Sequence, residues 1–306
     1  VKDIDFNLKK IVLSNRPSVN YSKLVLNYGS QTIIPREFET LVKNRNAFSI
    51  KPFLRAYDLI QKEDILDSVK ELPFVIVGSG LAAIEISYAL RKRWTSRSLK
   101  LLCDSRKINN KILKSLRNSN IDLVENLNFD HGKILLCTGN TSPLWAQKKL
   151  LDSDSHGRII TNQNLQLKSF SGIFAAGDCA VVDSAKRPAS GVFAVKVVNT
   201  LVQNLKKDIE GGSLKKWFPQ RIGLQIVNIF PSHHPKAFAI YRNFVFGPSF
   251  IFWILKHKID LNFINKFRTK RVIMKGNGKN ISLNDCRGCA AKIPQIVLNK
   301  SLINSN

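Results

Sequence analysis

The chain has 306 residues, a hydrophobic fraction of 44% and a formal net charge of +26. This length gives room for one large domain or two ordinary ones. The absence of a long apolar run and of a signal peptide argues against a membrane-spanning or secreted protein and favours a cytoplasmic one.

The charge is spread along the whole chain, with 48 basic and 22 acidic residues. No RNA- or DNA-binding motif accompanies it, so we expect no nucleic acid as a partner. Five cysteines, mostly isolated, indicate a reducing compartment rather than a disulfide scaffold. No cluster of residues indicates a metal site. Because Val1–Asn7 has the character of an internal segment, we expect the chain to be truncated.

The first fifty residues contain short apolar segments. Ile4–Phe6 and Lys10–Leu13 predict a small antiparallel meander. Leu24–Leu26 predicts a buried strand that stops at Gly29-Ser30, and from the residues alone Gly29 is best interpreted as an ordinary turn. Residues 50–70 contain a helix-like segment.

The stretch from 74 to 104 resembles a unit that binds a dinucleotide. An apolar strand, Phe74–Val77, is followed by the pattern G-x-G-x-x-A, a helix, a second strand and Asp104. Gly78 permits the tight turn, Gly80 lets the backbone approach a pyrophosphate, and Ala83 lets the helix pack on the strand. The helix N-terminus then offers N–H groups to the phosphates. The alternative is a bare structural turn.

Further elements follow in order. Lys111–Ser119 predicts a helix, Ile121–Val124 a short strand, and Lys133–Cys137 a buried strand that runs into Thr138-Gly139. Gly157–Ile160 and Leu165-Gln166 suggest a hairpin.

A strand in Gly172–Ala180 ends in Gly177-Asp178. Gly191–Leu205 then predicts one amphipathic helix. Its expected core face consists of Val192, Val195, Val198, Val202 and Leu205.

The tail from 217 to 270 is apolar, aromatic and basic, and Phe244–Leu255 is its most apolar part. Such a helix can lie on an anionic membrane, and it can equally cover its own domain or a partner subunit. The Gly-, Asn- and Lys-rich residues Lys275–Asn280 are interpreted as a linker.

The turns Gly29-Ser30, Thr138-Gly139 and Gly177-Asp178 bracket the nucleotide unit. This combination resembles the pyridine nucleotide-dependent FAD oxidoreductases, and more narrowly the type II NADH dehydrogenase-like branch. The resemblance implies an α/β, two-dinucleotide-binding-domain flavoprotein fold, with parallel sheets and helices in three layers. An NAD(P)H domain interrupts an FAD domain in this family. The first G-x-G-x-x-G of the family is missing, so the FAD domain is expected to be incomplete at its N-terminus.

The resemblance also implies the site. Glu85 is a candidate for seating the nicotinamide against the flavin, and Asp178 for hydrogen bonding to FAD. The helix that follows Ser190 would place its N-terminus near the flavin ring, where it favours negative charge. The implied cofactor-binding residues are Gly29, Ser30, Gly78, Gly80, Ala83, Asp104, Thr138, Gly139, Gly177, Asp178 and Gly191.

Two chemical alternatives stay open. Asp104 suits the ribose 2′-hydroxyl of NADH, which we favour, whereas Arg106 and Lys107 suit the 2′-phosphate of NADPH. Cys179 is interpreted as a small packed residue rather than a redox group, and no visible cysteine pair suits a flavin–dithiol relay.

The last segment, Asp285–Ile293, resembles the start of a selenide, water dikinase, whose Gly-Cys-x-x-Lys loop serves ATP-dependent selenophosphate formation. Cys289 and Lys292 match that loop, and an ammonium near a thiolate lowers the thiol pKa. Half a zinc site or an ordinary loop are the alternatives. ATP would be needed only in a dikinase part absent from this chain.

The sequence therefore predicts an FAD-dependent NAD(P)H oxidoreductase module, fused to a selenide, water dikinase. Its partner would be a small-molecule electron acceptor, a quinone or another compound. We also expect peripheral contact with the inner face of a membrane through 244–271, and a homo-oligomer. The alternatives are a non-catalytic scaffold for the dikinase and an inactive fragment.

Five segments are predicted. They are a partial FAD-binding domain (1–70), an NAD(P)H-binding domain (71–137), a return segment (138–215), a basic and aromatic region (216–272), and a linker with the start of a dikinase-like domain (273–306).

Overall fold

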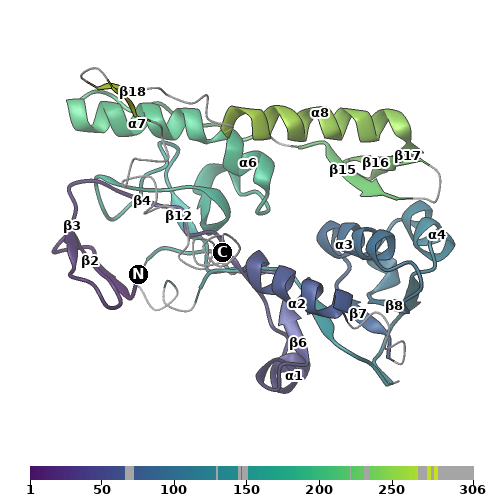
Figure 1. Ribbon diagram of the computed structural model, residues 1–306. Coiled ribbons are helices and arrows are strands. Elements are labelled where there is room, and N and C mark those ends of the chain that lie inside the picture. The colour runs from purple at the N-terminus through teal and green to yellow at the C-terminus, as the bar shows by residue number, and fades with distance from the viewer. Residues whose placement is uncertain are drawn as a thin grey trace. The chain divides into compact units, whose positions relative to one another are not determined.

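The computed structural model describes residues 1–65, 72–128, 130–143, 146, 151–220, 222–230, 234–267, 274–276 and 279–281. Contacts divide the chain into two units, Val1–Phe252 and Trp253–Asn306, whose helices and strands are drawn in Figure 1. The predicted dikinase loop with Cys289 and Lys292 lies outside the described residues.

A five-stranded parallel sheet organises the nucleotide unit. Its central strands, β7 (Phe74–Val77) and β10 (Ile134–Leu136), are buried apolar runs, as expected for a parallel sheet covered on both faces. The predicted strands near 74, 99, 121 and 133 are all present. The spatial order is β6 (Ala47–Ser49), β10, β7, β8 (Leu99–Leu102) and β9 (Asp122–Val124).

Side chains of β7 alternate between two cores. Phe74 and Ile76 pack in the cluster that holds the apolar sides of α2 (Phe53–Ile65), α3 (Leu81–Arg93) and α4 (Asn110–Asn118). Val75 and Val77 pack on the other face with Phe38 and the partly buried Leu41, from η1 (Arg36–Phe38) and α1 (Glu39–Lys43). The predicted α/β arrangement in three layers is confirmed, and η3 (Ser105–Lys107) follows β8.

The flanking segments build a second layered region. β4 (Leu24–Leu26) pairs in parallel with β13 (Ile173–Ala175). On one side this pair shares a core with Ile4 of the predicted meander, and on the other with Val197 of the helical segment. The meander consists of β1 (Asp3–Asp5), β2 (Lys10–Val12) and β3 (Val19–Asn20).

The chain passes between the two regions twice, and the two passages pair with each other. β5 (Gln31–Thr32) runs antiparallel to β11 (Asn140–Thr141). Next to this pair, Ile33 N donates to the Gly139 carbonyl oxygen over 3.2 Å. The two crossovers are therefore held side by side.

The predicted helix over 191–205 is wrong in two respects. It consists of two helices, α6 (Gly191–Lys196) and α7 (Val198–Glu210), which Figure 1 draws separately. Val197, between them, is only 3% exposed, whereas Val198 of the predicted core face is 47% exposed. Val192, Val195 and Val202 are exposed too, and of the predicted face only Leu205 packs inward.

The inward face carries an apolar stripe and a buried amide. Val197, Leu201 and Leu205 pack in one core cluster. Asn204, on the same face, is fully buried, and its side chain donates to the carbonyl oxygens of Asn164 and Lys215, each over 2.9 Å. It also accepts from Lys215 N over 2.8 Å. These three bonds to loop backbone offset the cost of burying a polar group on this face.

One smaller expectation is met only in part, and another fails. β12 (Ile159–Thr161) pairs in parallel with β14 (Ala180–Val182), and the expected hairpin is reduced to isolated bridges such as Thr161 with Leu167. In place of the expected linker, β18 (Met274–Gly276) pairs antiparallel with β19 (Lys279–Ile281). Short 3₁₀ turns, η4 (Gly177–Cys179) and η5 (Asp183–Ala185), flank β14.

The tail forms an antiparallel sheet of β15 (Gln225–Ile229), β16 (Lys236–Tyr241) and β17 (Phe244–Ser249), whose residues Val227 and Phe238 join the α3 core. α8 (Phe250–Phe267) follows. Within the described residues, no helix has the length and apolar character needed to cross a membrane.

Candidate nucleotide-binding sites

The turn after β7 carries two glycines in different surroundings. Gly78 has a φ of +142°, and the position of a Cβ there lies 3.4 Å from the Cβ of the buried Ala83. Gly80 is the N-cap residue of α3, and a Cβ on it would meet nothing within 4 Å. Open space at Gly80 lets a ligand reach the end of a thirteen-residue helix, where phosphates bind well.

A groove with an empty volume of about 1040 Å³ opens where β7, β8 and β10 end. Gly78, Ser79, Asp104 and Thr138 are among its lining residues. Ser79 Oγ accepts from Asp104 N over 2.9 Å, which ties the acidic strand end to the glycine turn. Because ligands of open α/β sheets bind at the carboxyl ends of the strands, these residues fit a dinucleotide.

Two basic residues near Asp104, Arg106 and Lys107, also line this groove. The guanidinium of Arg106 donates to both Asp104 carboxylate oxygens, over 2.9 and 3.1 Å. Lys107 Nζ lies 3.6 Å from Asp104 Oδ2. The hydrogen bond from Arg106 lowers the pKa of the Asp104 carboxyl below its ordinary value of 3.8. The arrangement thus offers a carboxylate to a ribose hydroxyl and a guanidinium to a phosphate.

Ser30 and Asp178, 148 residues apart in sequence, meet in the second region. Lys51 joins them: its Nζ lies 2.7 Å from Asp178 Oδ2 and 2.9 Å from Ser30 Oγ. Ser30 Oγ also donates to the same Asp178 oxygen over 3.4 Å. A hydroxyl, an ammonium and a carboxylate therefore converge at one point.

The backbone around this point is open. Gly29 and Gly177 have φ values of +76° and +81°, which favour glycine, and a Cβ on either would meet nothing within 4 Å. A groove with an empty volume of about 540 Å³ is lined by Ser30, Asp178 and Arg158, among others. This open, polar cradle fits the polyhydroxylated and phosphorylated part of a flavin dinucleotide.

Thr138 and Gly139 lie at the return crossover. Thr138 Oγ1 donates to the Ile33 carbonyl oxygen, and Gly139 has a φ of +105°. Thr138 lines the groove that contains Asp104, and the following strand β11 contributes Asn140 to the Asp178 groove. One short segment therefore borders both grooves.

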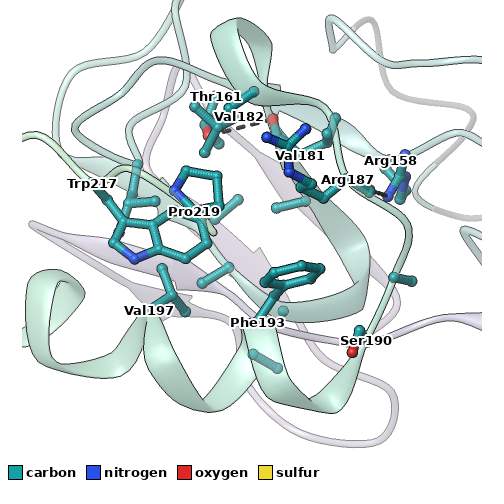
Figure 2. Close-up of a pocket in the computed structure, with 18 of the residues that line it drawn as sticks. Arg158, Thr161, Val181, Val182, Arg187, Ser190, Phe193, Val197, Trp217 and Pro219 are labelled. Atoms are coloured by element: carbon teal, nitrogen blue, oxygen red, sulfur yellow. Dashed lines mark hydrogen bonds between the residues drawn. The ribbon is translucent and has the colours of Figure 1, made fainter. Parts of the chain in front are cut away.

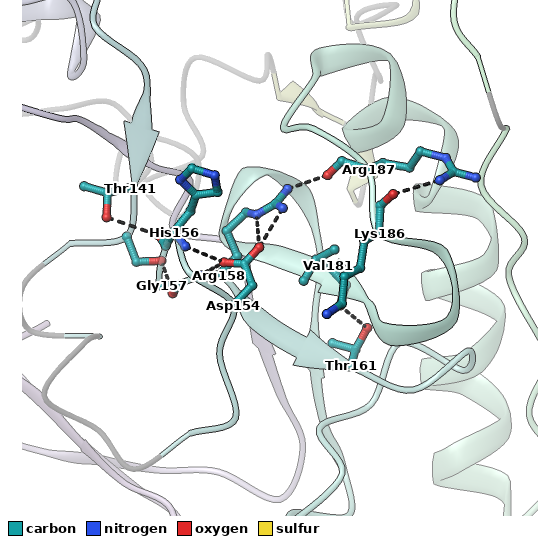
Figure 3. Close-up of polar contacts among 10 residues, drawn as sticks. Thr141, Asp154, His156, Gly157, Arg158, Thr161, Val181, Lys186 and Arg187 are labelled. Carbon is teal, nitrogen blue, oxygen red and sulfur yellow. Dashed lines mark hydrogen bonds and ion pairs between the residues drawn. The ribbon is translucent and has the colours of Figure 1, made fainter.

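Arg158 forms part of the rim of the Asp178 groove, and Figure 3 shows how it is held. Its Nε donates to Asp154 Oδ2 over 2.8 Å, and its Nη1 to the Arg187 carbonyl oxygen over 2.5 Å. Burial alone would raise the pKa of Asp154, but hydrogen bonds from Arg158 and His156 outweigh it and hold that pKa below 3.8. Arg158 is thus fixed by its own acidic partner.

A mostly apolar pocket, with an empty volume of about 460 Å³, lies beside Gly177. Figure 2 shows Phe193, Trp217 and Pro219 gathered there, with Arg187 nearby. Ser190 lines this pocket, but Gly191, its neighbour, begins a helix of only six residues. A helix of this length has a small dipole. The expected placement of its N-terminus near a flavin ring stays a prediction from sequence.

Glu85 lies on α3 and is half-buried. Its Oε1 accepts from the backbone N of Asn228, in β15, over 3.4 Å. The predicted contact of Glu85 with a nicotinamide and a flavin is not tested by this bond and stays a prediction.

The described cysteines, Cys103, Cys137 and Cys179, are free and buried. Burial raises the pKa of Cys179 to about 11, so its thiol is protonated at neutral pH. This environment supports the interpretation of Cys179 as a packed residue. Among the described residues, no group of three or more His, Cys, Asp or Glu could hold a metal ion.

Sequence reasoning missed Lys51. It follows β6 in a segment without a recognisable motif, and it lies 127 residues from Asp178. Only the pairing of the crossovers brings them together, so no local signal could have found it.

No model of a protein family matches the chain. It is similar to ferroptosis suppressor protein 1 of Taeniopygia guttata, with 24% identity over 252 residues, covering 69% of this chain and 65% of the relative. It is also similar to a probable NADH dehydrogenase of Dictyostelium discoideum, with 26% identity over 241 residues, covering 60% of this chain and 52% of the relative. The chain thus spans between half and two thirds of these relatives.

Solved structures share the fold. The sulfide:quinone oxidoreductase of Aquifex aeolicus matches with a TM-score of 0.63 and 15% identity, covering 87% of this chain and 74% of that one. An FAD-dependent pyridine nucleotide-disulphide oxidoreductase of Desulfovibrio vulgaris matches with a TM-score of 0.52 and 18% identity, covering 78% of this chain and 66% of that one.

The chain therefore has the two-dinucleotide-binding flavoprotein fold, and its sequence is similar to those of a ferroptosis suppressor protein 1 and a probable NADH dehydrogenase. These similarities give no support to the dikinase part of the resemblance.

Proposed function

We propose that the protein is an FAD-dependent NAD(P)H oxidoreductase that delivers electrons to a small-molecule acceptor. The observation that carries this proposal is the pair of grooves bordered by the return crossover. One contains the glycine turn and Asp104, and the other contains Ser30 and Asp178. Flavin, when bound, supplies the hydride-accepting chemistry.

In this proposal the residues of the first groove bind NAD(P)H. Gly80 and the N-terminus of α3 hold the pyrophosphate, and Gly78 and Ala83 keep the turn close to the sheet. Asp104 receives the ribose hydroxyl, with NADH favoured. Glu85 would seat the nicotinamide, by analogy with the family.

The second groove would hold FAD. Gly29, Gly177 and Gly139 keep the backbone open to the ligand, and Ser30 and Asp178 form hydrogen bonds with it. Ser190 and Gly191 would lie near the ring.

The acceptor we propose is a quinone or another small molecule. The sulfide:quinone oxidoreductase that shares the fold motivates the quinone class. The fold by itself does not select an acceptor. Reduction of soluble quinone analogues by the full-length protein with NADH would support this class, and turnover only with other acceptors would remove it.

A second role is peripheral membrane contact through 244–271 on the inner face of a membrane. It is favoured by exposed apolar side chains on α8, among them Ile251 at 71% exposure, together with Lys256 and Lys258. The same exposed apolar side chains suit a homo-oligomer or a scaffold for a fused dikinase. Liposome flotation of the full-length protein, with and without 244–271, separates these: equal flotation removes the membrane role.

The dikinase fusion is also a proposal. Cys289 would be the nucleophile and Lys292 would lower its pKa. Selenide-dependent ATP consumption by the full-length protein, lost on Cys289→Ser, would support it. An absence of that activity in the unaltered protein would contradict it.

The experiment for the main proposal is spectroscopic. The purified full-length protein should carry a flavin absorbance band that NADH bleaches without oxygen. A protein without flavin would rule out the proposed function and leave a scaffold or an inactive product.

A further inference from the structure

We infer that Lys51 is a positioning residue for FAD, an inference that rests on the proposed function. Its ammonium holds the Asp178 carboxylate in one orientation and neutralises it. The flavin's ribityl and pyrophosphate groups can then bind over the Gly177-Asp178 turn.

The placement of Lys51 is fixed by its backbone. Lys51 N donates to Thr32 Oγ1 over 3.0 Å, and Thr32 is buried, at the first crossover. Lys51 lies between β6 and α2, in the nucleotide unit. Its side chain therefore extends from one region toward the carboxylate of the other.

The side-chain hydrogen bonds of Asp178 involve one of its two carboxylate oxygens. Lys51 Nζ and Ser30 Oγ both donate to Oδ2. In the part of the chain that the structure describes, Oδ1 has no comparable side-chain donor. A ligand hydroxyl can thus donate to Oδ1 while Lys51 keeps the group from rotating.

Charge gives the second reason. A bare carboxylate next to a pyrophosphate repels it, and at this site the repulsion would be strong because Asp178 is partly screened from water. The side chains of Lys51 and Asp178 are 33% and 23% exposed. An ammonium 2.7 Å from the carboxylate removes most of that repulsion.

Arg158, a cation that lines this groove, is poorly suited to the task. Its guanidinium already pairs with Asp154, and both side chains are nearly buried. Lys51, by contrast, pairs with Asp178, which lines the groove.

The test is a set of FAD dissociation constants for the full-length protein, measured by flavin fluorescence. Lys51→Met should weaken FAD binding at least tenfold, and Lys51→Arg, which keeps the charge, should stay within about threefold. Lys168→Met is the matched control, since Lys168 forms a comparable exposed pair with Asp183, with the two atoms 2.6 Å apart. It should leave the dissociation constant unchanged.

A double-mutant cycle distinguishes positioning from general destabilisation. If Lys51 acts through Asp178, then Lys51→Met should add little to the loss caused by Asp178→Asn. If the losses of FAD affinity caused by Lys51→Met and Asp178→Asn add in the double variant, the inference is overturned. It is also overturned if the Lys51→Met variant binds FAD normally. If the unaltered protein binds no FAD, the proposed function fails and the inference fails with it. Normal binding by the unaltered protein and by Lys51→Met alike overturns the inference alone.

Discussion

A Cβ on Gly78 would lie 2.5 Å from the carbonyl oxygen of Cys137, so the glycine turn rests directly on the end of the neighbouring strand. The constraint on Gly78 is therefore internal packing, reinforced by its φ of +142°. Gly80, two residues on, has no such neighbour and an ordinary φ of −84°. The two glycines of one motif thus serve different ends.

This difference predicts different defects. Gly78→Ala forces a backbone shift and should lower the free energy of unfolding by about 2 kcal/mol. Gly80→Ala should leave the melting temperature unchanged but raise KM for NADH about tenfold or more, because the methyl group blocks the approach of the pyrophosphate. Thermal unfolding and steady-state kinetics measure the two effects.

The variants Gly78→Ala and Gly80→Ala serve as controls for each other. Loss of stability in Gly80→Ala, or an unchanged KM in that variant, would contradict the account of the turn.

The choice between NADH and NADPH depends on Asp104 and Arg106. Asp104→Ala should raise KM for NADH about tenfold, since it removes a charged hydrogen bond. It should also improve NADPH relative to NADH, because Arg106 is freed for the 2′-phosphate. Arg106→Ala should lower the use of NADPH and leave that of NADH nearly unchanged. If neither substitution alters the ratio of kcat/KM values, these residues do not determine the preference.

The pH dependence of NADH binding follows from the Asp104 pKa. Arg106 stabilises the charged form and lowers the pKa from 3.8, so the carboxylate is ionised at higher pH. KM for NADH should therefore stay constant between about pH 5 and about pH 8 and rise only in strong acid, where Asp104 takes up a proton. NADH is the substrate for this test, because the 2′-phosphate of NADPH itself titrates at about pH 6. A midpoint near neutral pH in KM for NADH would show that another group governs binding.

The helical segment gives a matched stability test. Val197→Ala should cost about 2 kcal/mol of unfolding free energy, since this side chain is 3% exposed. Val198→Ala, one residue on and 47% exposed, should cost well under 1 kcal/mol. Denaturant titration measures both. Equal losses would mean that the side chain of Val198 is covered in the intact protein.

The β7–turn–α3–β8 unit could be predicted because each of its signals is local. The apolar run of Phe74–Val77, the glycines and Asp104 follow one another within about thirty residues. The buried face of the helices near Val197 could not, because two apolar stripes run along this segment, and the bonds of Asn204 to Asn164 and Lys215 on the buried one have no local signal.

Residues of the candidate site also differ in whether a local signal in the sequence predicts them. Ser30 and Asp178 could be proposed from strand-end turns. Lys51 could not, because its position depends on the bond of its backbone to Thr32 and on the pairing of the two crossovers.

Anaerobic titration of the purified full-length protein with NADH, followed by visible absorbance, tests directly whether NADH reduces a flavin bound to this chain. We expect a bound flavin that loses its absorbance in proportion to the NADH added. We expect the same flavin in Gly80→Ala, but with bleaching only at much higher NADH. A protein that carries no flavin, or a bound flavin that NADH and NADPH both leave oxidised, would show that the protein is not an FAD-dependent NAD(P)H oxidoreductase.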